Sequence, residues 1–385
     1  MTMNTLEKKI TAVLERSLEK QEAAGYNVMV RRNGEQIAYA EAGYASIAEQ
    51  KPIRRDNIFR LYSQSKPITS AAVMMLIERG LIDLFDPVET YLPGFANPRV
   101  VTAEGLVPAK RSVNILDLLG MVAGLAYPDA DQAGQYVAEL FIRNQEDMRA
   151  GGGLSTVELC NRMGALPLTF HPGEQFRYST CADILGGVVE VVSGMPFAQF
   201  LQDNLFEPLG MKDTGFWVPE EKQDRFVTCY QRTDGGLKEF HELHLCVGDY
   251  SRMPAFASGG AGLVSTLDDY ARFAEMLLRG GELDGRRVLG EATVAWMTQP
   301  QLKNIAIWDS LAGFNYGKLM RVCTDPGQAP GLASLGEYGW DGWLGTYFAN
   351  FPNEHLTIQL NQNTKDAGTT ACTRKVRNVI LSEVL

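Results

Sequence analysis

Hydrophobic residues near the start of the chain recur at helical spacing and then give way to two β-prone runs. The spacing predicts an amphipathic helix over residues 5–23 that ends at Gly25; its apolar positions are Leu6, Ile10, Val13, Leu14 and Leu18. The runs on either side of Asn33-Gly34 are rich in Val, Ile, Tyr and Ala. Asn-Gly is a strong hairpin signal, so this stretch predicts two antiparallel strands.

Residues 67–80, PITSAAVMMLIERG, are apolar on nearly every side. A helix that is hydrophobic all round is buried, so this one is expected to run through the centre of the protein. Strand patterns return near the end of the chain in TYFANFP and HLTIQLNQN, which Pro352-Asn353-Glu354 separate. Residues 373–385 predict a closing helix.

The middle of the chain, residues 82–254, is richer in helical stretches, turn residues and long loops. The chain has 385 residues, and domains average roughly 150 residues, so two lobes are expected. We predict an α/β (α+β) fold with an antiparallel sheet flanked by helices. Residues 1–81 and 255–385 are expected to form the α/β lobe. The mostly helical lobe, residues 82–254, is inserted into it, and the active site lies between the two lobes.

Composition narrows the class of protein. Hydrophobic residues make up 45% and charged residues 21%, as in an ordinary soluble protein. The net charge is −10, so the basic surface of a nucleic-acid binder is not expected and the partner is predicted to be a small molecule. Neither a membrane span nor the apolar core of a signal peptide is visible. The six cysteines form no C-x-x-C pair, and we expect reduced thiols in the cytoplasm.

Several familiar motifs are missing or incomplete. The run SGGAGLVS at 258–265 lacks the Lys-Ser/Thr pair of a P-loop and predicts a turn into a helix at 266–269. His241 and His244 have no H-E-x-x-H context, and no serine is framed as G-x-S-x-G. We therefore expect no metal and no cofactor.

The motif S-x-x-K occurs twice, at Ser17 and at Ser63. Ser17 is expected in mid-helix on a solvated face. Ser63 and Lys66 stand three residues apart just before Pro67, which is tolerated only in the first turn of a helix. Ser63 would thus lie at the positive end of a buried helix, with an amine on the same face. Taken alone, this segment is equally consistent with an N-cap serine and a surface lysine.

Two further motifs follow in order: Tyr178-Ser179-Thr180 before an apolar helix, and Trp340-Asp341-Gly342 before a strand. With Ser63-Gln-Ser-Lys66, the chain resembles the serine β-lactamases and penicillin-binding proteins. It is most similar to their class C branch and its cytoplasmic, family VIII-type carboxylesterases. The resemblance covers nearly the whole chain, including LLGMVAGLAY at 118–127 and residues 259–289.

The resemblance implies a role for each motif. Ser63 is the nucleophile that becomes acylated, and Lys66 favours its deprotonation. Tyr178 resembles the family's base, so Lys66 and the helix end would have to lower its pKa from near 10. Backbone N–H groups of Ser63 and Trp343 form the oxyanion hole, and water completes a two-step acyl transfer.

Departures from the penicillin-recognising pattern indicate the substrate. Trp340 stands where those members carry Lys or His, so no cation pairs with a β-lactam carboxylate. Thr180 replaces an Asn, and Asp341 replaces the middle Gly of the esterase W-G-G motif. The expected substrate-binding residues are Tyr127, Thr180, Trp340, Asp341 and Gly342. Asp341 could narrow the cleft, repel anions or form an exposed turn, whereas Trp296 and Trp308 are expected to be packing residues.

The leading hypothesis is a carboxylesterase that acts on small-molecule, short-chain acyl esters. A β-lactamase or D-Ala-D-Ala peptidase, and an acyltransferase, are alternatives that use the same acyl-enzyme. A non-catalytic binding module is the alternative from a different class.

Overall fold

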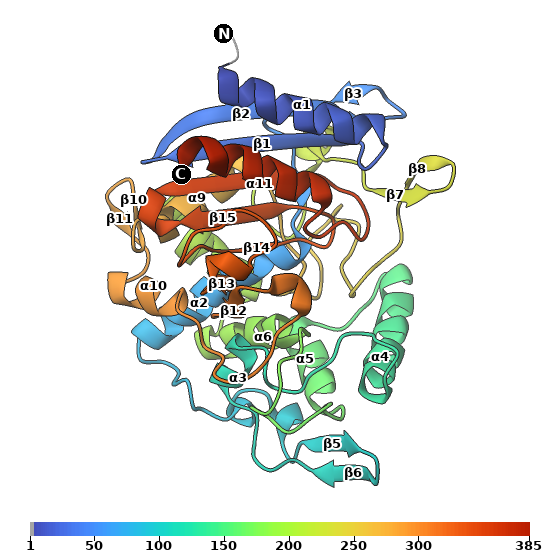
Figure 1. Ribbon diagram of the computed structural model, residues 1–385. Coiled ribbons are helices and arrows are strands. Elements are labelled where there is room, and N and C mark those ends of the chain that lie inside the picture. The colour runs from blue at the N-terminus through green and yellow to red at the C-terminus, as the bar shows by residue number, and fades with distance from the viewer. Residues whose placement is uncertain (1–3) are drawn as a thin grey trace.

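A computed structural model describes residues 4–385, and within that range one eight-stranded antiparallel sheet organises the chain (Figure 1). The first strands follow the helix near the N-terminus, and the others come from the end of the chain. Across the sheet the order is β12 (Phe314–Tyr316), β13 (Arg321–Cys323), β14 (Tyr338–Asp341), β15 (Tyr347–Phe351), β16 (Leu356–Asn361), β1 (Gly25–Arg32), β2 (Glu35–Ser46) and β3 (Lys51–Pro52). The predicted hairpin is confirmed: Asn33 and Gly34 turn between β1 and β2, with φ of 53° and 80°.

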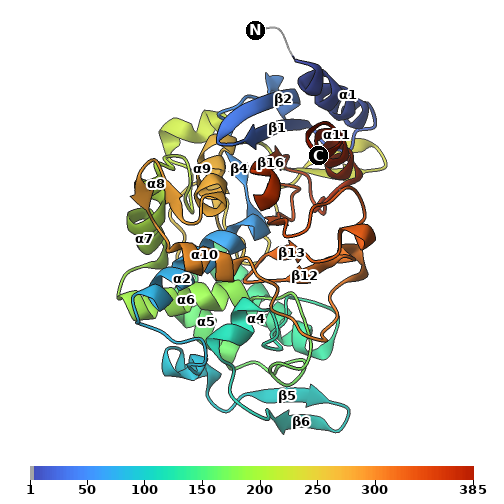
Figure 2. The same cartoon turned by 60° about the vertical axis from the view of Figure 1, so that its left-hand side comes forward.

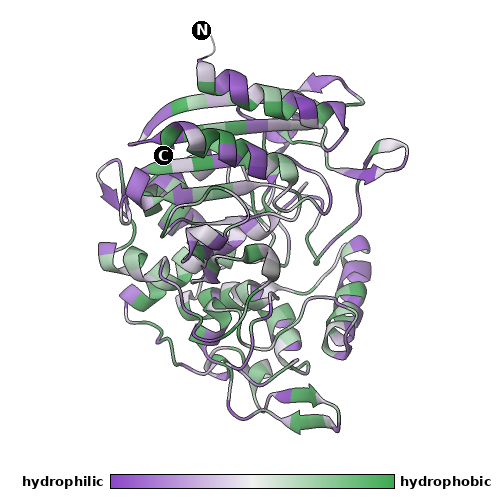
Figure 3. Ribbon diagram, in the orientation of Figure 1, coloured by the Kyte–Doolittle hydropathy of each residue, from purple (hydrophilic) through white to green (hydrophobic). Residues whose placement is uncertain are grey.

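Helices cover both faces of this sheet. On one face lie α1 (Thr5–Glu19) and α11 (Ala371–Val384), which lie beside each other in both views (Figures 1 and 2). Their buried side chains share one hydrophobic cluster with those of β1, β2, β15 and β16. On the other face α9 (Leu267–Leu278) contacts β1, β15 and β16. Hydrophobic and hydrophilic residues mix along α1 and α11 (Figure 3), as expected for helices with one face on the sheet and the other in water.

The remaining helices gather below the sheet around α2 (Lys66–Glu78) and α6 (Cys181–Ser193). They are α3 (Ile115–Leu119), α4 (Gln132–Arg149), α5 (Thr156–Gly164), α7 (Phe197–Leu201), α8 (Glu207–Leu209) and α10 (Glu291–Met297). The other strands form short pairs: β4 (Phe59–Arg60) with β9 (Val264–Ser265), β5 (Arg99–Thr102) with β6 (Gly105–Pro108), β7 (Tyr230–Thr233) with β8 (Gly236–Glu239), and β10 (Glu282–Leu283) with β11 (Arg286–Arg287).

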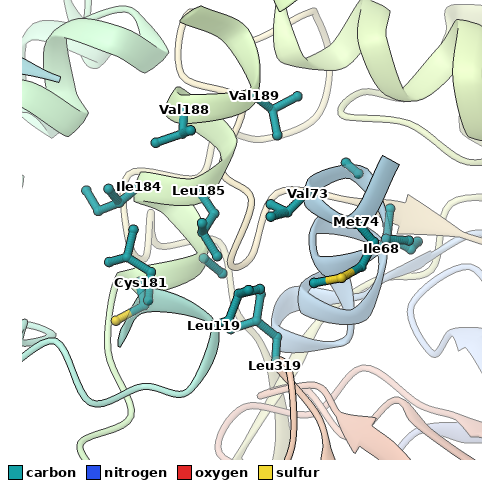
Figure 4. Packing of buried hydrophobic residues seen from close by; sticks show 14 of the residues in the cluster. Ile68, Val73, Met74, Leu119, Cys181, Ile184, Leu185, Val188, Val189 and Leu319 are labelled. Carbon is teal, nitrogen blue, oxygen red and sulfur yellow. The ribbon is translucent and has the colours of Figure 1, made fainter. Parts of the chain in front are cut away.

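The predicted central helix is confirmed as α2, whose side chains from Lys66 to Leu76 are all buried. Figure 4 shows Val73 of α2 pointing toward Leu185 of α6, within a single cluster of buried apolar side chains from both helices. A large fully buried apolar side chain contributes about 1.5–3 kcal/mol, so this packing anchors the start of α2. In residues 4–385 no single helix is long and apolar enough to cross a membrane.

The prediction for the first S-x-x-K was wrong. Ser17 on α1 is 4% exposed, and its hydroxyl lies 2.8 Å from that of Tyr26 and donates to Glu22. Residue 17 points toward the sheet because it lies three and seven positions after the buried Leu14 and Ile10. This serine therefore stabilises the packing of α1 and is not part of a second active site.

Candidate active site

Ser63 lies in the connection from β4 to α2, in a 3₁₀ turn formed by Tyr62–Ser65. The residue before it, Tyr62, has φ of 46°, a left-handed conformation that is rare for a bulky aromatic residue. A hydrogen bond from the N–H of Leu61 to the carbonyl of Leu263, 2.9 Å long, holds the turn against the neighbouring loop. Pro67 lies in the first turn of α2, as predicted, so the serine sits at the start of the buried helix.

Lys66 is fully buried beside this serine. Its Nζ atom donates hydrogen bonds to Ser63 Oγ at 3.1 Å, to the Tyr127 hydroxyl at 3.0 Å and to the Gly260 carbonyl at 2.9 Å. Burial lowers the pKa of Lys66 from 10.5 to about 7, although the charge of Asp183 acts in the opposite direction. The amine is therefore able to gain and lose a proton near neutral pH while it touches the hydroxyl of Ser63.

Tyr178 lies beside Lys66, with its ring centre 4.5 Å from Nζ. The indole Nε1 of Trp340 donates to the Tyr178 hydroxyl at 2.9 Å. Burial raises the pKa of Tyr178, and hydrogen bonds with Ser63 and Trp340 lower it by less. The expectation that its surroundings lower this pKa below the usual value is therefore wrong for the resting protein, because desolvation of the phenolate outweighs the two donors.

The third motif closes the site opposite the serine. Gly342 follows β14, and a Cβ atom at this position would lie 2.2 Å from Thr346 Oγ1 and 2.3 Å from the carbonyl of Leu61, so no larger residue fits. The ring of Trp343 stacks on His244 with centroids 3.9 Å apart and also contacts Tyr62 at 4.9 Å. Two elements distant in sequence thus hold the Trp343 ring in place.

Asp341 forms an ion pair, which decides among the alternatives left open for it. Its carboxylate accepts from the guanidinium of Arg321 at 2.7 Å and from the hydroxyl of Thr369. Arg321 is 4% exposed, so Asp341 neutralises a buried cation in the cavity wall. The Asp341 carboxylate is therefore not an unpaired charge that repels anions, nor an exposed turn residue.

A cavity of about 510 Å³ opens above Ser63. Aromatic and aliphatic side chains form most of its wall, and its polar side chains come from several elements. The lining residues are Ser63, Tyr178, Trp308, Ser310, Leu311, Phe314, Arg321, Ala329, Pro330, Gly331, Trp340, Asp341, Gly342, Trp343, Tyr347, Gly368, Thr369, Arg374, Arg377 and Asn378. The volume is typical of small-molecule sites. The three motifs therefore meet at one cavity.

Some predicted residues lie elsewhere than on the cavity wall. Tyr127 contacts Lys66 rather than the cavity, and Thr180 is 1% exposed with its hydroxyl 3.3 Å from the carbonyl of Ala126. Trp308, expected to be a packing residue, is 44% exposed, lines the cavity and meets the Tyr178 ring edge-on at 5.2 Å. Trp296 packs against Lys318, in line with its predicted packing role.

Sequence reasoning missed two contributors to the site. Gly260 supplies the carbonyl that accepts from Lys66, and Asp183 accepts from the N–H of Gly260 at 3.0 Å. A carboxylate in the first turn of the apolar helix that follows Tyr178 was a visible signal for Asp183. No local pattern could have paired it with Gly260, because the two residues are 77 positions apart.

Comparisons with known proteins identify the family. The family model described as "Beta-lactamase" matches residues 10–380. Esterase EstB of Burkholderia gladioli is 30% identical over 354 residues, which cover 89% of this chain and 86% of that protein. Acyltransferase calJ of Penicillium decumbens is 27% identical over 336 residues, covering 80% and 76% of the two chains.

A solved structure shows the same architecture. EstCE1, described as a hydrolase with promiscuous acyltransferase activity, superposes with a TM-score of 0.83 at 27% identity. The superposition covers 97% of this chain and 98% of EstCE1.

Proposed function

This chain belongs to the β-lactamase family, and from that premise we propose that it is a serine esterase that forms a covalent acyl-enzyme on Ser63. The observation that carries the proposal is the contact between Ser63 Oγ and the buried amine of Lys66, 3.1 Å apart at the base of a mostly apolar cavity. The similarity to esterase EstB over 89% of the chain supports ester substrates.

In the acylation step, neutral Lys66 takes the proton of Ser63 as the serine oxygen attacks the ester carbonyl. A pKa of about 7 gives the amine both a substantial neutral fraction and enough basicity at neutral pH. Tyr178, protonated in the resting protein, gives its proton to the departing alkoxide. The alcohol leaves, and the enzyme holds a protonated Lys66 beside a Tyr178 phenolate.

In the deacylation step, the Tyr178 phenolate takes a proton from water, which attacks the acyl-enzyme. Lys66 returns its proton to Ser63 Oγ as the acid departs, so protons and charge balance over the cycle. Tyr178 thus keeps the role of base that the resemblance implied, but in the second half of the reaction. The N–H of Trp340 stabilises the phenolate while it exists.

The oxyanion hole is proposed at the backbone N–H groups of Ser63 and Trp343. Both residues line the cavity. Within residues 4–385 the carbonyl of Trp343 is paired with the N–H of Ala367 at 3.0 Å, whereas its own N–H has no backbone acceptor. One such donor is worth about 3–4 kcal/mol in a transition state.

We propose short-chain acyl esters as substrates, with a bulky alcohol portion. A cavity of about 510 Å³ exceeds what a short acyl chain fills, and Trp308, Phe314 and Trp340 line it with apolar surface. In the motif position where a cation would meet a β-lactam carboxylate, Trp340 instead donates to Tyr178. Ester hydrolysis is therefore proposed to exceed β-lactam hydrolysis.

The test uses a fluorophosphonate probe, p-nitrophenyl butyrate and nitrocefin, with intact-mass measurement. Labelling of Ser63 and ester turnover, both lost in Ser63→Ala, support the proposal. A fall of about 10²–10⁴-fold in the turnover of an alkyl butyrate, whose alkoxide needs the Tyr178 proton, supports it as well in Tyr178→Phe. Ester turnover that survives Ser63→Ala would refute it. Nitrocefin turnover faster than ester turnover would favour a β-lactamase, and no labelling or turnover would favour a binding module.

Acyl transfer to an alcohol is the second candidate function. The similarity to acyltransferase calJ and to EstCE1 supports it, as does an apolar cavity wall that can hold an acceptor alcohol in place of water. Adding a large alcohol to the p-nitrophenyl butyrate assay should then divert product from butyrate to the new ester. Butyrate as the sole product would exclude that alcohol as an acceptor.

We further propose that the protein works in the cytoplasm, where its six cysteines stay reduced. All six are free thiols and buried, and disulfides are rare in that compartment. Cell fractionation with an antibody tests the location, and recovery in an extracellular or periplasmic fraction would contradict it.

A further inference from the structure

Asp183 is a buried carboxylate that the reaction steps above do not use. It lies in the first turn of α6 with 4% of its surface exposed. Burial raises its pKa, while the charge of Lys66 and hydrogen bonds from Ser258 and Gly260 act in the opposite direction. An ionised group in such a place is costly unless an opposite charge and hydrogen-bond donors compensate it. Lys66, Ser258 and Gly260 supply that compensation for Asp183.

The carboxylate and the amine of Lys66 hold the same residue from two sides. Asp183 Oδ1 accepts from Ser258 Oγ at 2.5 Å and from the N–H of Gly260 at 3.0 Å. The carbonyl of Gly260 then accepts from Lys66 Nζ at 2.9 Å. A Cβ atom on Gly260 would stand 2.8 Å from Asp183 Oδ2, so the close approach requires glycine at this position.

We propose that Asp183 is a positioning residue that sets the charge of Lys66: it fixes the Gly260 carbonyl against the amine and supplies the negative charge that favours the protonated amine. The inference rests on the proposed function, in which Lys66 receives the proton of Ser63. A nearby carboxylate makes the buried amine a stronger base and therefore a better acceptor of that proton.

Other titratable groups around Asp183 do not compete for this role. The elements packed against it contribute Tyr127, Tyr178, Cys160, Cys181 and Cys246, and burial raises the pKa of each. All five are uncharged in the resting protein at neutral pH, whereas Lys66 titrates there. Removing the charge of Asp183 therefore changes the protonation of Lys66 at neutral pH and leaves these five groups uncharged.

The experiment compares Asp183→Asn with the unmodified protein. Asparagine keeps an oxygen at Oδ1 for both donors, removes the charge and places an NH2 group at the position of Oδ2. The second-order rate of fluorophosphonate labelling at Ser63 is measured from pH 5 to 9, with the labelled peptide identified by mass. The charge of Asp183 raises the pKa of Lys66, and a nearby opposite charge typically shifts a pKa by about 1–3. We expect the acidic limb of the profile to move at least about one unit lower in Asp183→Asn, and the plateau rate to fall.

A matched control perturbs the same loop without changing charge. Thr69 Oγ1 donates to the carbonyl of Gly259 at 2.6 Å, and Thr69→Val removes that bond at nearly constant volume. The acidic limb of the pH profile of Thr69→Val should stay in place even if its labelling rate falls. Asp183→Ser also removes the charge, with a smaller side chain, and its acidic limb should likewise move lower, which keeps the test decisive if Asp183→Asn does not fold.

Three outcomes overturn the proposal: an unmoved limb in folded Asp183→Asn, a limb moved upward, or loss of labelling at every pH despite a native melting curve. An unmoved acidic limb in folded Asp183→Ser has the same meaning if Asp183→Asn cannot be purified. Labelling that persists in Ser63→Ala would instead overturn the proposed function, so the two failures are distinguishable.

Discussion

Replacing Trp340 by phenylalanine tests whether its N–H, rather than its bulk, serves the reaction. The bond to the Tyr178 hydroxyl is 2.9 Å long. A hydrogen bond to a neutral acceptor is worth about 0.5–1.5 kcal/mol, and one to a charged acceptor about 1.5–3 kcal/mol. The bond thus gains about 1–2 kcal/mol as Tyr178 becomes a phenolate, which corresponds to about 5- to 30-fold in rate.

The choice of ester makes this prediction sharper. An alkyl butyrate needs a proton on its leaving oxygen, whereas p-nitrophenolate leaves without one. We expect Trp340→Phe to lower kcat/KM, which reports acylation, by about 5- to 30-fold for an alkyl butyrate in a pH-stat assay. The loss for p-nitrophenyl butyrate should be several-fold smaller.

Trp308→Phe is the matched control. Trp308 meets the ring of Tyr178 edge-on at 5.2 Å, and within residues 4–385 no hydrogen bond from it reaches the Tyr178 hydroxyl. Its kcat/KM should stay within about threefold for both esters, because only packing changes. Equal losses for the two esters in Trp340→Phe, or equal losses in both variants, would refute the role of the indole N–H. A melting curve checks that the loss of the 5% exposed indole leaves the protein folded.

Three further predictions concern charge. The kcat/KM for esters should fall about tenfold per pH unit below about pH 7 because Lys66 becomes protonated; a rate that stays flat down to pH 5 would argue against the amine as the proton acceptor. Lys66→Met should abolish labelling of Ser63 yet raise the free energy of unfolding by about 1–3 kcal/mol at pH 7.5. At pH 7.5 the burial of the Lys66 amine costs about 4 kcal/mol. The loss of the cation beside Asp183 offsets part of the gain in the variant. The pKa of Lys66 is lower in the folded than in the unfolded chain, so the free energy of unfolding of the unmodified protein rises from pH 7 to 10.5. The stability advantage of Lys66→Met in chemical denaturation should therefore shrink over that pH range. Asp341→Asn should lower the free energy of unfolding by about 3–5 kcal/mol in the same assay because it leaves Arg321 buried without its partner; an unchanged denaturation midpoint would show that other groups neutralise Arg321.

Local patterns were reliable where a single element decides the outcome. The amphipathic helix, the Asn33-Gly34 hairpin and the buried α2 each follow from a short-range period or turn preference that tertiary contacts only reinforce. Pro67 placed Ser63 at the helix start for the same reason, since the ring excludes all but the first turn. The order of the three motifs then led to the family, whose model matches residues 10–380.

Side-chain orientation was less accessible from these patterns. Ser17 was predicted to face solvent and is buried, and Trp308 was predicted to pack in the interior and lines the cavity. Both depend on which surface a segment meets after the chain folds back on itself. Asp341 could be interpreted in three ways until Arg321, 20 positions earlier in the chain, proved to be its partner.

The sequence by itself determined the main elements and pointed to the residues that we propose for acyl transfer, because helical periods, turn residues and motif spacing are local properties. Only the tertiary structure decided their chemical state. Burial moves the pKa of Lys66 close to neutrality and keeps Tyr178 protonated at rest, and Asp183 reaches the amine through a loop 77 positions away. Desolvation and charge act through space, so the reactivity of these groups depends on what the fold packs around them.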